Sequence, residues 1–279
     1  MNGRKINLLI AGNDYAFDGM LTDLISITKY CKECLCVYIF TMDLTDKNPK
    51  WKPVSIEQAK VLDGVVKKVN KDSEIILKDV TDVYRDTLEG NMSEGTQYTP
   101  YTLCRLLCDR VEGLPDKLLY IDTDIVAFDD ISKLYDQDIE GYLLAGVKDY
   151  YGRVFINPNY INAGVLLFNL KAMNEANIFK KCRALLWMKN YKFSDQTVIN
   201  KTCRGGIKYL PYIYNDQKIL HKNTVIRHFA KTIIWMPYFH TRNIKPWQER
   251  KLHKYGIRYV DDILAEYNKI KEDIKNIQK

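Results

Sequence analysis

Two aspartates that follow an apolar run are the clearest candidates for chemistry in this sequence. Residues 118–121 read Leu-Leu-Tyr-Ile, which predicts a buried central strand covered on both faces. Asp122 and Asp124 then lie at its carboxyl end, where open α/β sheets bind ligands. Two carboxylates this close repel each other unless a cation or a proton lies between them, so the pair indicates a divalent-metal site. The alternative is that both simply cap the following turn.

Four further motifs carry polar side chains of the kind such a site needs. They are Asn162-Ala163-Gly164-Val165, Asp195-Gln196, Arg227-His228-Phe229 and Lys245-Pro246-Trp247. An imidazole beside two carboxylates would shift the metal preference from Mg²⁺ toward Mn²⁺. A histidine next to a β-run is, however, more often a hydrogen-bonded core residue. Gly164 would allow another group to approach the backbone of its strand closely.

The elements that must position these residues alternate regularly in the first half of the chain. We expect strands at 6–11, 35–40 and 75–77, helices at 17–30 and 54–69, a surface loop over 82–98 and a helix over 100–112. This strand, helix, strand order is typical of a parallel, doubly wound sheet.

The second half is predicted to extend the sheet and then become irregular. We expect strands at 143–147 and 160–169, a short helix from 129, helices at 173–190 and 195–201, and short strands at 207–210 and 225–228. An aromatic, irregular stretch follows over 229–247. Residues 261–279 form an amphipathic helix whose mixed charges favour packing on the domain over membrane contact.

Composition describes an ordinary globular chain. Of 279 residues, 46% are hydrophobic and 28% charged, and the net charge is +7. That excess suits anionic partners such as nucleotides, phospholipid headgroups or acidic glycans, or simply a solvated basic surface. We expect no nucleic-acid partner. No window approaches the ~20 apolar residues of a membrane span.

Seven scattered cysteines and the lack of a signal-like start predict reduced thiols and a cytoplasmic location. Contact with the inner face of a membrane stays open. Cys31 and Cys34 have the spacing of a zinc knuckle or a redox pair, but no second pair follows. Free cysteines beside a buried strand are therefore the favoured interpretation.

In their order and separation, these motifs resemble the retaining glycosyltransferases of family 8. This group contains bacterial lipopolysaccharide galactosyl- and glucosyltransferases and glycogenin, and the resemblance runs over residues 6–247. It implies an α/β, GT-A fold: a Rossmann-like, mostly parallel sheet flanked by helices, with a small mixed β extension. It also implies one domain over 1–279, with a nucleotide-binding half (1–124), a sugar and acceptor half (125–250) and a helical segment (251–279).

The function implied by the resemblance is metal-dependent, retaining hexosyl transfer. The donor would be UDP-glucose or UDP-galactose, and the acceptor a hydroxyl of a glycan or of a glycolipid such as lipopolysaccharide. Asp122, Asp124 and His228 match the family's ligands for Mn²⁺ or Mg²⁺.

The resemblance assigns the remaining site residues as well. Those matching donor contacts are Ala11, Asn13, Asp14, Tyr15, Arg105, Asp122, Thr123, Asp124, Asn162, Ala163 and Lys245. Within this set Tyr15 would stack on the uracil base and Lys245 would pair with the diphosphate. Asp195 would bind sugar hydroxyls, and Gln196 would face the anomeric carbon.

Simpler explanations exist for several of these positions. Residues 12–14 would also serve as an ordinary strand-to-helix turn. Arg105 would be solvated on an exposed helix face, and Asp195 would cap a helix. Lys245 would be a solvated lysine beside a rigid proline.

The chain departs from the family pattern at two places. Thr197 stands where many relatives carry a third acid after Asp195 and Gln196, which disfavours a covalent nucleophile there and favours front-face substitution. Seventeen positions separate His228 from Lys245, far more than in most relatives, and His240 becomes an alternative ligand. The aromatic residues 229–240, inserted residues 233–238 included, are a candidate acceptor surface, together with Tyr150 and Tyr151.

Two other functions stay open. Residues 118–126 also fit the D-x-D opening of haloacid-dehalogenase-like phosphatases, with Asp122 as nucleophile, although no later acidic pair is evident. A non-catalytic nucleotide-sugar-binding protein is the other alternative, if Thr197 or the insertion has abolished turnover.

Overall fold

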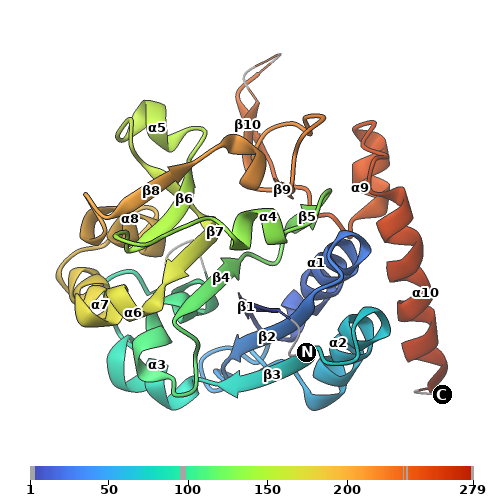
Figure 1. The fold of residues 1–279 in the computed structure, drawn as a ribbon, viewed down its shortest axis with the longest axis horizontal. Helices are drawn as coiled ribbons and strands as arrows, with labels where there is room; N and C mark the ends of the chain where they lie inside the picture. Colours follow the sequence, from blue (N-terminus) through green and yellow to red (C-terminus); the bar gives the residue numbers. More distant parts are fainter. Residues whose placement is uncertain (1–3, 95–98, 235, 237, 278–279) are drawn as a thin grey trace.

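A seven-stranded sheet forms the centre of the computed structural model, which describes residues 4–94, 99–234, 236 and 238–277 (Figure 1). The strand order in this part of the chain is β3-β2-β1-β4-β7-β6-β8. The strands are β1 (Lys5–Ala11), β2 (Cys34–Thr41), β3 (Glu74–Asp79), β4 (Lys117–Ile121), β6 (Leu144–Lys148), β7 (Ile161–Asn169) and β8 (Ile207–Leu210).

The sheet is mostly parallel, as predicted. β1 pairs in parallel with β2 and β4, β2 with β3, and β6 with β8. Only β7 runs against its neighbours β4 and β6 among these seven strands. β2 and β7 are almost wholly buried, which explains why their sequences are largely apolar.

Helices cover both faces of the sheet, and side chains alternate between two hydrophobic layers. One layer packs under α1 (Phe17–Tyr30), α2 (Ile56–Val69) and α10 (Asp261–Ile277). The other packs under α3 (Thr81–Thr87), the 3₁₀ helix η2 (Pro100–Arg110), α6 (Leu170–Glu175), α7 (Ile178–Met188) and α8 (Ser194–Thr202). Figure 1 shows the two sets on opposite sides of the strands. Leu8 faces the first layer and Leu9 the second, as a period of two requires.

Two small β pairs make up the extension beside the main sheet. β5 (Ile125–Ala127) pairs antiparallel with β9 (Ile226–His228), and a parallel bridge joins Asp216 to Arg227 of β9. β10 (Thr232–Ile234) and β11 (His240–Arg242) form an antiparallel hairpin. The expectation of an irregular stretch over 229–247 is therefore wrong for these residues. Trp235 and Pro237 lie outside the described residues.

Other elements differ from the sequence expectation in detail. The helix expected over 100–112 is the 3₁₀ helix η2, and the one over 173–190 is two helices separated at Asn177, which has φ +54°. The expected loop over 82–98 contains α3, and residues 95–98 lie outside the described part. The short elements are η1 (Asp14–Ala16), α4 (Ser132–Tyr135), α5 (Gly152–Phe155), η3 (Tyr212–Tyr214) and α9 (Glu249–Lys254).

The last helix packs on the body of the molecule, as expected. Ile263, Leu264 and Tyr267 of α10 are buried, and the ammonium of Lys271 lies 2.7 Å from the carboxylate of Asp18 on α1. The expected helix extends to residue 279, and residues 278–279 lie outside the description. None of the described helices combines the length and the apolarity needed to cross a bilayer. All seven cysteines are buried and unbridged.

Candidate active site

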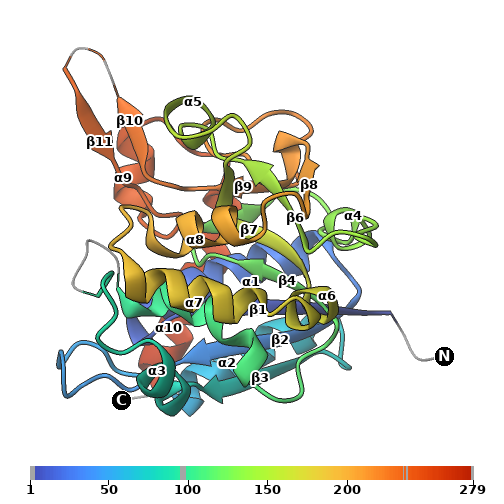
Figure 2. The ribbon, with the colours of Figure 1, turned by 90° about the vertical axis from the view of Figure 1, so that its left-hand side faces the viewer.

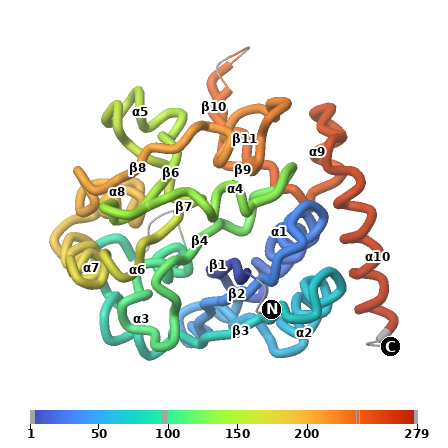
Figure 3. Tube along the Cα trace, in the orientation of Figure 1, coloured from blue at the N-terminus to red at the C-terminus, as the bar shows by residue number. Residues whose placement is uncertain are grey.

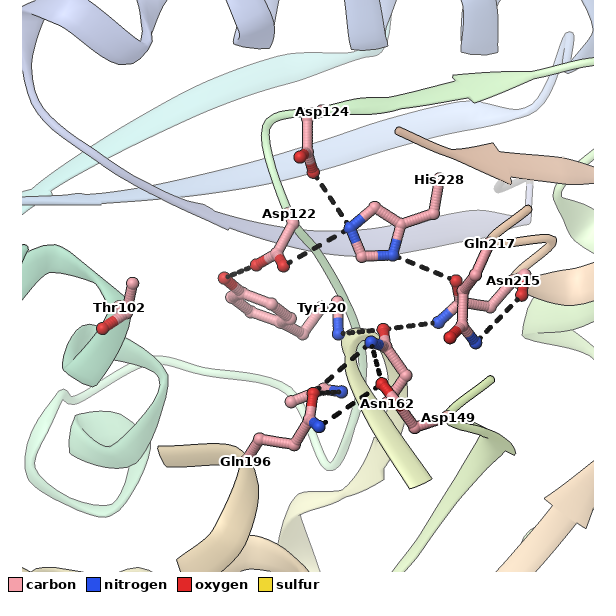
Figure 4. A network of polar contacts seen from close by, with 12 residues as sticks. Thr102, Tyr120, Asp122, Asp124, Asp149, Asn162, Gln196, Asn215, Gln217 and His228 are labelled. Atoms are coloured by element: carbon pink, nitrogen blue, oxygen red, sulfur yellow. Dashed lines mark hydrogen bonds and ion pairs between the residues drawn. The ribbon is translucent and has the colours of Figure 1, made fainter. Parts of the chain in front are cut away.

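Two aspartates and one histidine meet at the carboxyl end of β4. Asp122 and Asp124 follow the strand directly, and antiparallel pairing sets His228 of β9 opposite Ile125 of β5. Nε2 of His228 lies 3.0 Å from Oδ1 of Asp124 and 3.8 Å from Oδ2 of Asp122 (Figure 4). The ligand atoms of all three lie within 4.8 Å of one another, a spacing that one metal ion could bridge.

Two glycines let the backbone close around this cluster. A Cβ atom on Gly164 of β7 would lie 2.2 Å from Cε1 of His228 and 2.8 Å from Oδ2 of Asp122. A Cβ atom on Gly19 of α1 would lie 2.1 Å from the carbonyl oxygen of Thr123. The predicted close approach at Gly164 is confirmed. The loop that carries the aspartates is thus held between β7 and α1.

A chain of amides orients the imidazole of His228. Nδ2 of Asn215 donates to Oδ1 of Asn162 at 2.9 Å, so Oδ1 of Asn215 must face Nδ1 of His228, 3.1 Å away. An amide oxygen can only accept, and Nδ1 therefore carries a hydrogen. This leaves Nε2 of His228 facing the carboxylates as a ligand atom. Such a hydrogen bond behind a ligating histidine is the usual companion of a metal site.

The alternative ligand His240 lies elsewhere. It is on β11, and its Nδ1 lies 3.0 Å from the carbonyl oxygen of Tyr238. It does not belong to the described group of side chains that could share a metal.

Lys245 reaches the cluster despite the insertion. Its ammonium nitrogen lies 2.5 Å from Oδ2 of Asp124. β10 and β11 run antiparallel, so the chain leads away from the site along β10 and back along β11, and the two strands project from the body of the molecule (Figure 2). Lys245 and His228 are therefore far apart in the sequence but lie close together in space. The interpretation of Lys245 as a merely solvated side chain is wrong.

The neighbours of Asp124 keep its carboxylate ionised. Burial by itself would raise the pKa of Asp124, but its electrostatic interactions and hydrogen bonds with His228 and Lys245 outweigh it and lower the pKa below the usual range. An ionised carboxylate is the ligand that a hard divalent cation prefers.

Arg105 is buried rather than solvated. Its side chain on η2 places Nη2 2.8 Å from Oδ1 of Asp122, Nη1 2.5 Å from the carbonyl oxygen of Ala163, and Nε 3.3 Å from Oδ2 of Asp195. Its guanidinium also lies over the ring of Tyr120, whose hydroxyl donates to Oδ1 of Asp122 at 2.7 Å. Burial opposes the charge of Arg105, but these anionic neighbours raise its pKa.

A second network lies on the other side of Asp122, where the sugar-binding residues were predicted. Oε1 of Gln196 accepts from the backbone amide of Ala163 at 3.0 Å, and its Nε2 lies 3.4 Å from Oδ2 of Asp149. Nδ2 of Asn162 donates to the same Asp149 oxygen at 2.9 Å. Figure 4 shows Gln196, Asn162 and Asp149 converging.

Asp195 does not cap its helix. α8 begins at Ser194 with Phe193 before it, and the Asp195 carboxylate lies against Arg105 and the hydroxyl of Ser194. Burial raises the pKa of Asp195, and Arg105 offsets this only in part. Thr197 lies two residues after Asp195 in α8, and its hydroxyl oxygen is 2.8 Å from the hydroxyl oxygen of Tyr160.

The predicted uridine loop opens at the same edge of the sheet. Ala11 ends β1, which pairs in parallel with β4 through Leu9 and Tyr120. Tyr15 is 64% exposed. Two hydrogen bonds tie this loop to the segment before α2: Nδ2 of Asn13 donates to the carbonyl oxygen of Lys50, and the amide of Asp14 donates to that of Lys52. One carboxylate oxygen of Asp14 is buried without a described partner. No described contact joins these four residues directly to the aspartates.

Sequence reasoning missed three members of the site. Asp149 follows β6 directly, so the same strand-end rule that singled out Asp122 could have found it. Tyr120 lies within the apolar run and gave no polar signal. Asn215 lies between η3 and β9, where no periodicity marks a residue.

Comparison with known proteins gives consistent matches. The family model for glycosyl transferase family 8 matches residues 8–251. Glycosyltransferase GlyA of Streptococcus pneumoniae serotype 4 is 34% identical over 121 residues, which cover 42% of this chain and 16% of that protein. The lipopolysaccharide 1,2-glucosyltransferase of Escherichia coli K12 is 34% identical over 107 residues, covering 34% of this chain and 32% of that one. This chain thus matches only a minor part of either relative.

Solved structures share the fold. The galactosyltransferase LgtC, crystallised with donor and acceptor sugar analogues, superposes with a TM-score of 0.70 at 17% identity, covering 94% of this chain and 96% of that one. The predicted GT-A architecture is confirmed.

Proposed function

Because the chain belongs to glycosyltransferase family 8, we propose that it moves a hexose, glucose or galactose, from a UDP-sugar to an acceptor hydroxyl with retention of configuration. The observation that carries this proposal is the convergence of Asp122, Asp124 and His228 with the ammonium of Lys245 at the ligand-binding edge of the sheet. We propose that the acceptor hydroxyl belongs to a glycan or a glycolipid and that the reaction takes place in the cytoplasm.

The three side chains that could act as metal ligands fit a divalent cation. Two hard carboxylate oxygens and one oriented imidazole suit Mn²⁺, and Mg²⁺ less well. When bound, such an ion would stabilise the negative charge on the leaving diphosphate. The residues that would hold it are Asp122, Asp124 and His228.

Positive side chains would complete the diphosphate subsite. Lys245 pairs with Asp124, so its ammonium lies close to where a metal-bound diphosphate would lie. A fixed cation there lowers the cost of charge developing on the leaving group. Arg105 pairs with the carboxylates of Asp122 and Asp195 and adds a buried positive charge.

The sugar side offers hydrogen-bonding groups rather than a free nucleophile. Asn162, Asp195 and Asp149 would bind the hexose hydroxyls, and Gln196, held by the Ala163 amide, would face the anomeric carbon. A carboxamide is a poor nucleophile, and Thr197 replaces the acid found in many relatives. This supports front-face substitution, in which the acceptor attacks from the side that UDP leaves.

A stability measurement tests the donor assignment. A ligand that binds only the folded state must raise the melting temperature. UDP-glucose or UDP-galactose with Mn²⁺ should do so in the native chain and fail to do so in Asp124→Ala. The exposed Asp86 of α3 supplies a control, since Asp86→Ala should keep the shift. A chain that no nucleotide-sugar stabilises, with phosphatase activity instead, would contradict the proposal.

A further inference from the structure

Three loops beside the site form one continuous rim, which we call the loop rim: residues 149–157, 217–223 and the β10–β11 hairpin. Tyr150 joins the first two, because its amide donates to Oε1 of Gln217 and its hydroxyl accepts from Nζ of Lys218, both at 2.8 Å. Tyr151 joins the first and third, because its hydroxyl lies 3.1 Å from the carbonyl oxygen and 3.0 Å from the amide of Ile233. Both ribbon views show α5 beside β10 (Figures 1 and 2).

Each loop of the rim exposes large apolar side chains. Val154 and Phe155 on the first loop are 70% and 66% exposed, Ile219 on the second is 54% exposed, and Met236 on the hairpin is 79% exposed. Scattered single apolar residues are normal on a protein surface. Their concentration on three adjoining loops is what a docking surface would present.

The charge of the rim identifies the kind of partner. Within the loop rim, residues 150–157, 217–223 and 232–242 contain no Asp or Glu, although 35 of the 279 residues are acidic, and the carboxylate of Asp149 is bonded to Asn162 in the site. The cations of these residues are Arg153, Lys218, Lys222 and Arg242, and Lys231 directly precedes the hairpin. Figure 3 shows α5 and β10, which come from distant parts of the sequence, on the same side of the molecule. The surface therefore combines protruding apolar groups with one sign of charge.

We propose that the loop rim docks on the surface of an anionic lipid bilayer. Lysine and arginine side chains would meet the headgroups, and Phe155, Met236 and their neighbours would enter the boundary with the acyl chains. A second copy of the chain fits less well, because a symmetric rim-to-rim contact would bring like charges together. The α10 helix cannot serve, since its apolar face is buried against α1.

This docking would turn the site toward the lipid. Asp149, which bonds Asn162 in the sugar network, immediately precedes Tyr150 of the rim. An acceptor anchored in the bilayer would therefore reach the site along the rim. The docking itself needs no donor and no turnover, whereas the presentation of a lipid-anchored acceptor rests on the proposed function.

Vesicle sedimentation tests the docking with the full chain. We expect binding to vesicles of phosphatidylglycerol and phosphatidylcholine, and weak binding to pure phosphatidylcholine. Phe155→Ser with Met236→Ser should weaken binding by about tenfold or more, because two apolar side chains leave the boundary. Lys222→Gln and Lys231→Gln should each cost about fivefold.

Matched controls come from other surfaces of the molecule. Met188→Ser on α7, where the side chain is 76% exposed, and Lys60→Gln on α2 should leave vesicle binding unchanged. The inference is overturned if anionic vesicles do not bind the chain, or if the rim variants bind as well as the native chain. It is also overturned if the rim variants instead abolish a dimer or the binding of a soluble glycan.

The two proposals fail separately. The rim variants should keep the melting-temperature shift that UDP-sugar and Mn²⁺ produce. Vesicle binding by a chain that no UDP-sugar stabilises would contradict the proposed function and support the docking surface. A chain that UDP-sugar stabilises but that does not bind anionic vesicles would support the proposed function and contradict the docking surface.

Discussion

The ammonium of Lys245 lies 2.5 Å from Oδ2 of Asp124, whose other oxygen lies 3.0 Å from Nε2 of His228. Lys245 and His228 are seventeen positions apart in the sequence, and the antiparallel strands β10 and β11 between them allow both side chains to reach Asp124. The insertion adds a surface without removing a charge from the cluster. Its place in the loop rim gives the added residues a role of their own.

Replacing Lys245 should slow transfer more than it weakens donor binding. In the proposed reaction Lys245 would act mainly as charge develops on the leaving diphosphate, so we expect Lys245→Ala to lower kcat by about 100-fold. Steady-state kinetics of UDP release measure this. Lys251→Ala on α9 is the control. A variant that raises only KM would mean that Lys245 contributes binding alone.

The assignment of His228 rather than His240 as the metal ligand can be tested by substitution. His228→Ala should weaken Mn²⁺-dependent donor binding, and Asn215→Ala should lower Mn²⁺ affinity by roughly 10- to 100-fold because the imidazole loses its orienting partner. Calorimetric titration of Mn²⁺ gives both values. His240→Ala should change neither. Loss of Mn²⁺ binding in His240→Ala with retention in His228→Ala would reverse the assignment.

Gly164 is expected to accept no side chain. Gly164→Ala would drive a methyl group into His228 and Asp122, so Mn²⁺-dependent stabilisation by UDP-sugar should disappear. Gly64 on α2 is a matched control, because nothing lies within 4 Å of a Cβ atom there. Gly64→Ala should stabilise the fold by about 0.5–1 kcal/mol. Normal donor binding by Gly164→Ala would show that the site tolerates a shift of β7.

Asp23 predicts a pH dependence of stability. It is fully buried on α1, and neither carboxylate oxygen has a described hydrogen bond of normal geometry. Burial first, and then the charge of Asp124, raise the pKa of Asp23 well above its usual value, and the Ile125 amide opposes this only in part. The folded chain therefore keeps a proton that the unfolded chain releases above about pH 4.

The sign of the effect follows from this proton. As pH rises from about 4 toward the raised pKa, the unfolded state is favoured and the free energy of unfolding falls. Asp23→Asn removes this loss, so it should be more stable than the native chain at pH 7 and nearly equal to it at pH 3.5. Denaturant unfolding at both pH values measures the difference. Equal stabilities at pH 7 would mean that Asp23 is solvated in the folded state.

Much of the architecture was predictable because local patterns and global packing agree. The buried strands β2, β4 and β7 have continuous apolar sequences, and α1 has the predicted bounds. The aspartates could be singled out because they end such a strand. The break at Asn177 and the 3₁₀ geometry of η2 left no mark on the apolar spacing, and only the fold reveals them.

The site was less predictable where tertiary contacts decide the role. From the sequence pattern alone Arg105 is expected to be solvated on a helix face, and only the structure shows that it is buried against Asp122 and Asp195. Asn215 acts through His228 from a segment with no periodicity, so its role depends wholly on the pairing of β5 with β9. Lys245 was suggested by resemblance alone, and the hairpin that returns it to Asp124 could not be derived from spacing.

The most direct test of the central claim is UDP release from UDP-glucose or UDP-galactose in the presence of Mn²⁺. The native chain should release UDP, slowly to water and faster once an acceptor is supplied. Removal of Mn²⁺ by a chelator and the Asp124→Ala substitution should each abolish release, while Asp86→Ala should not. UDP release that persists unchanged in Asp124→Ala, or that never occurs with either donor, would contradict the account.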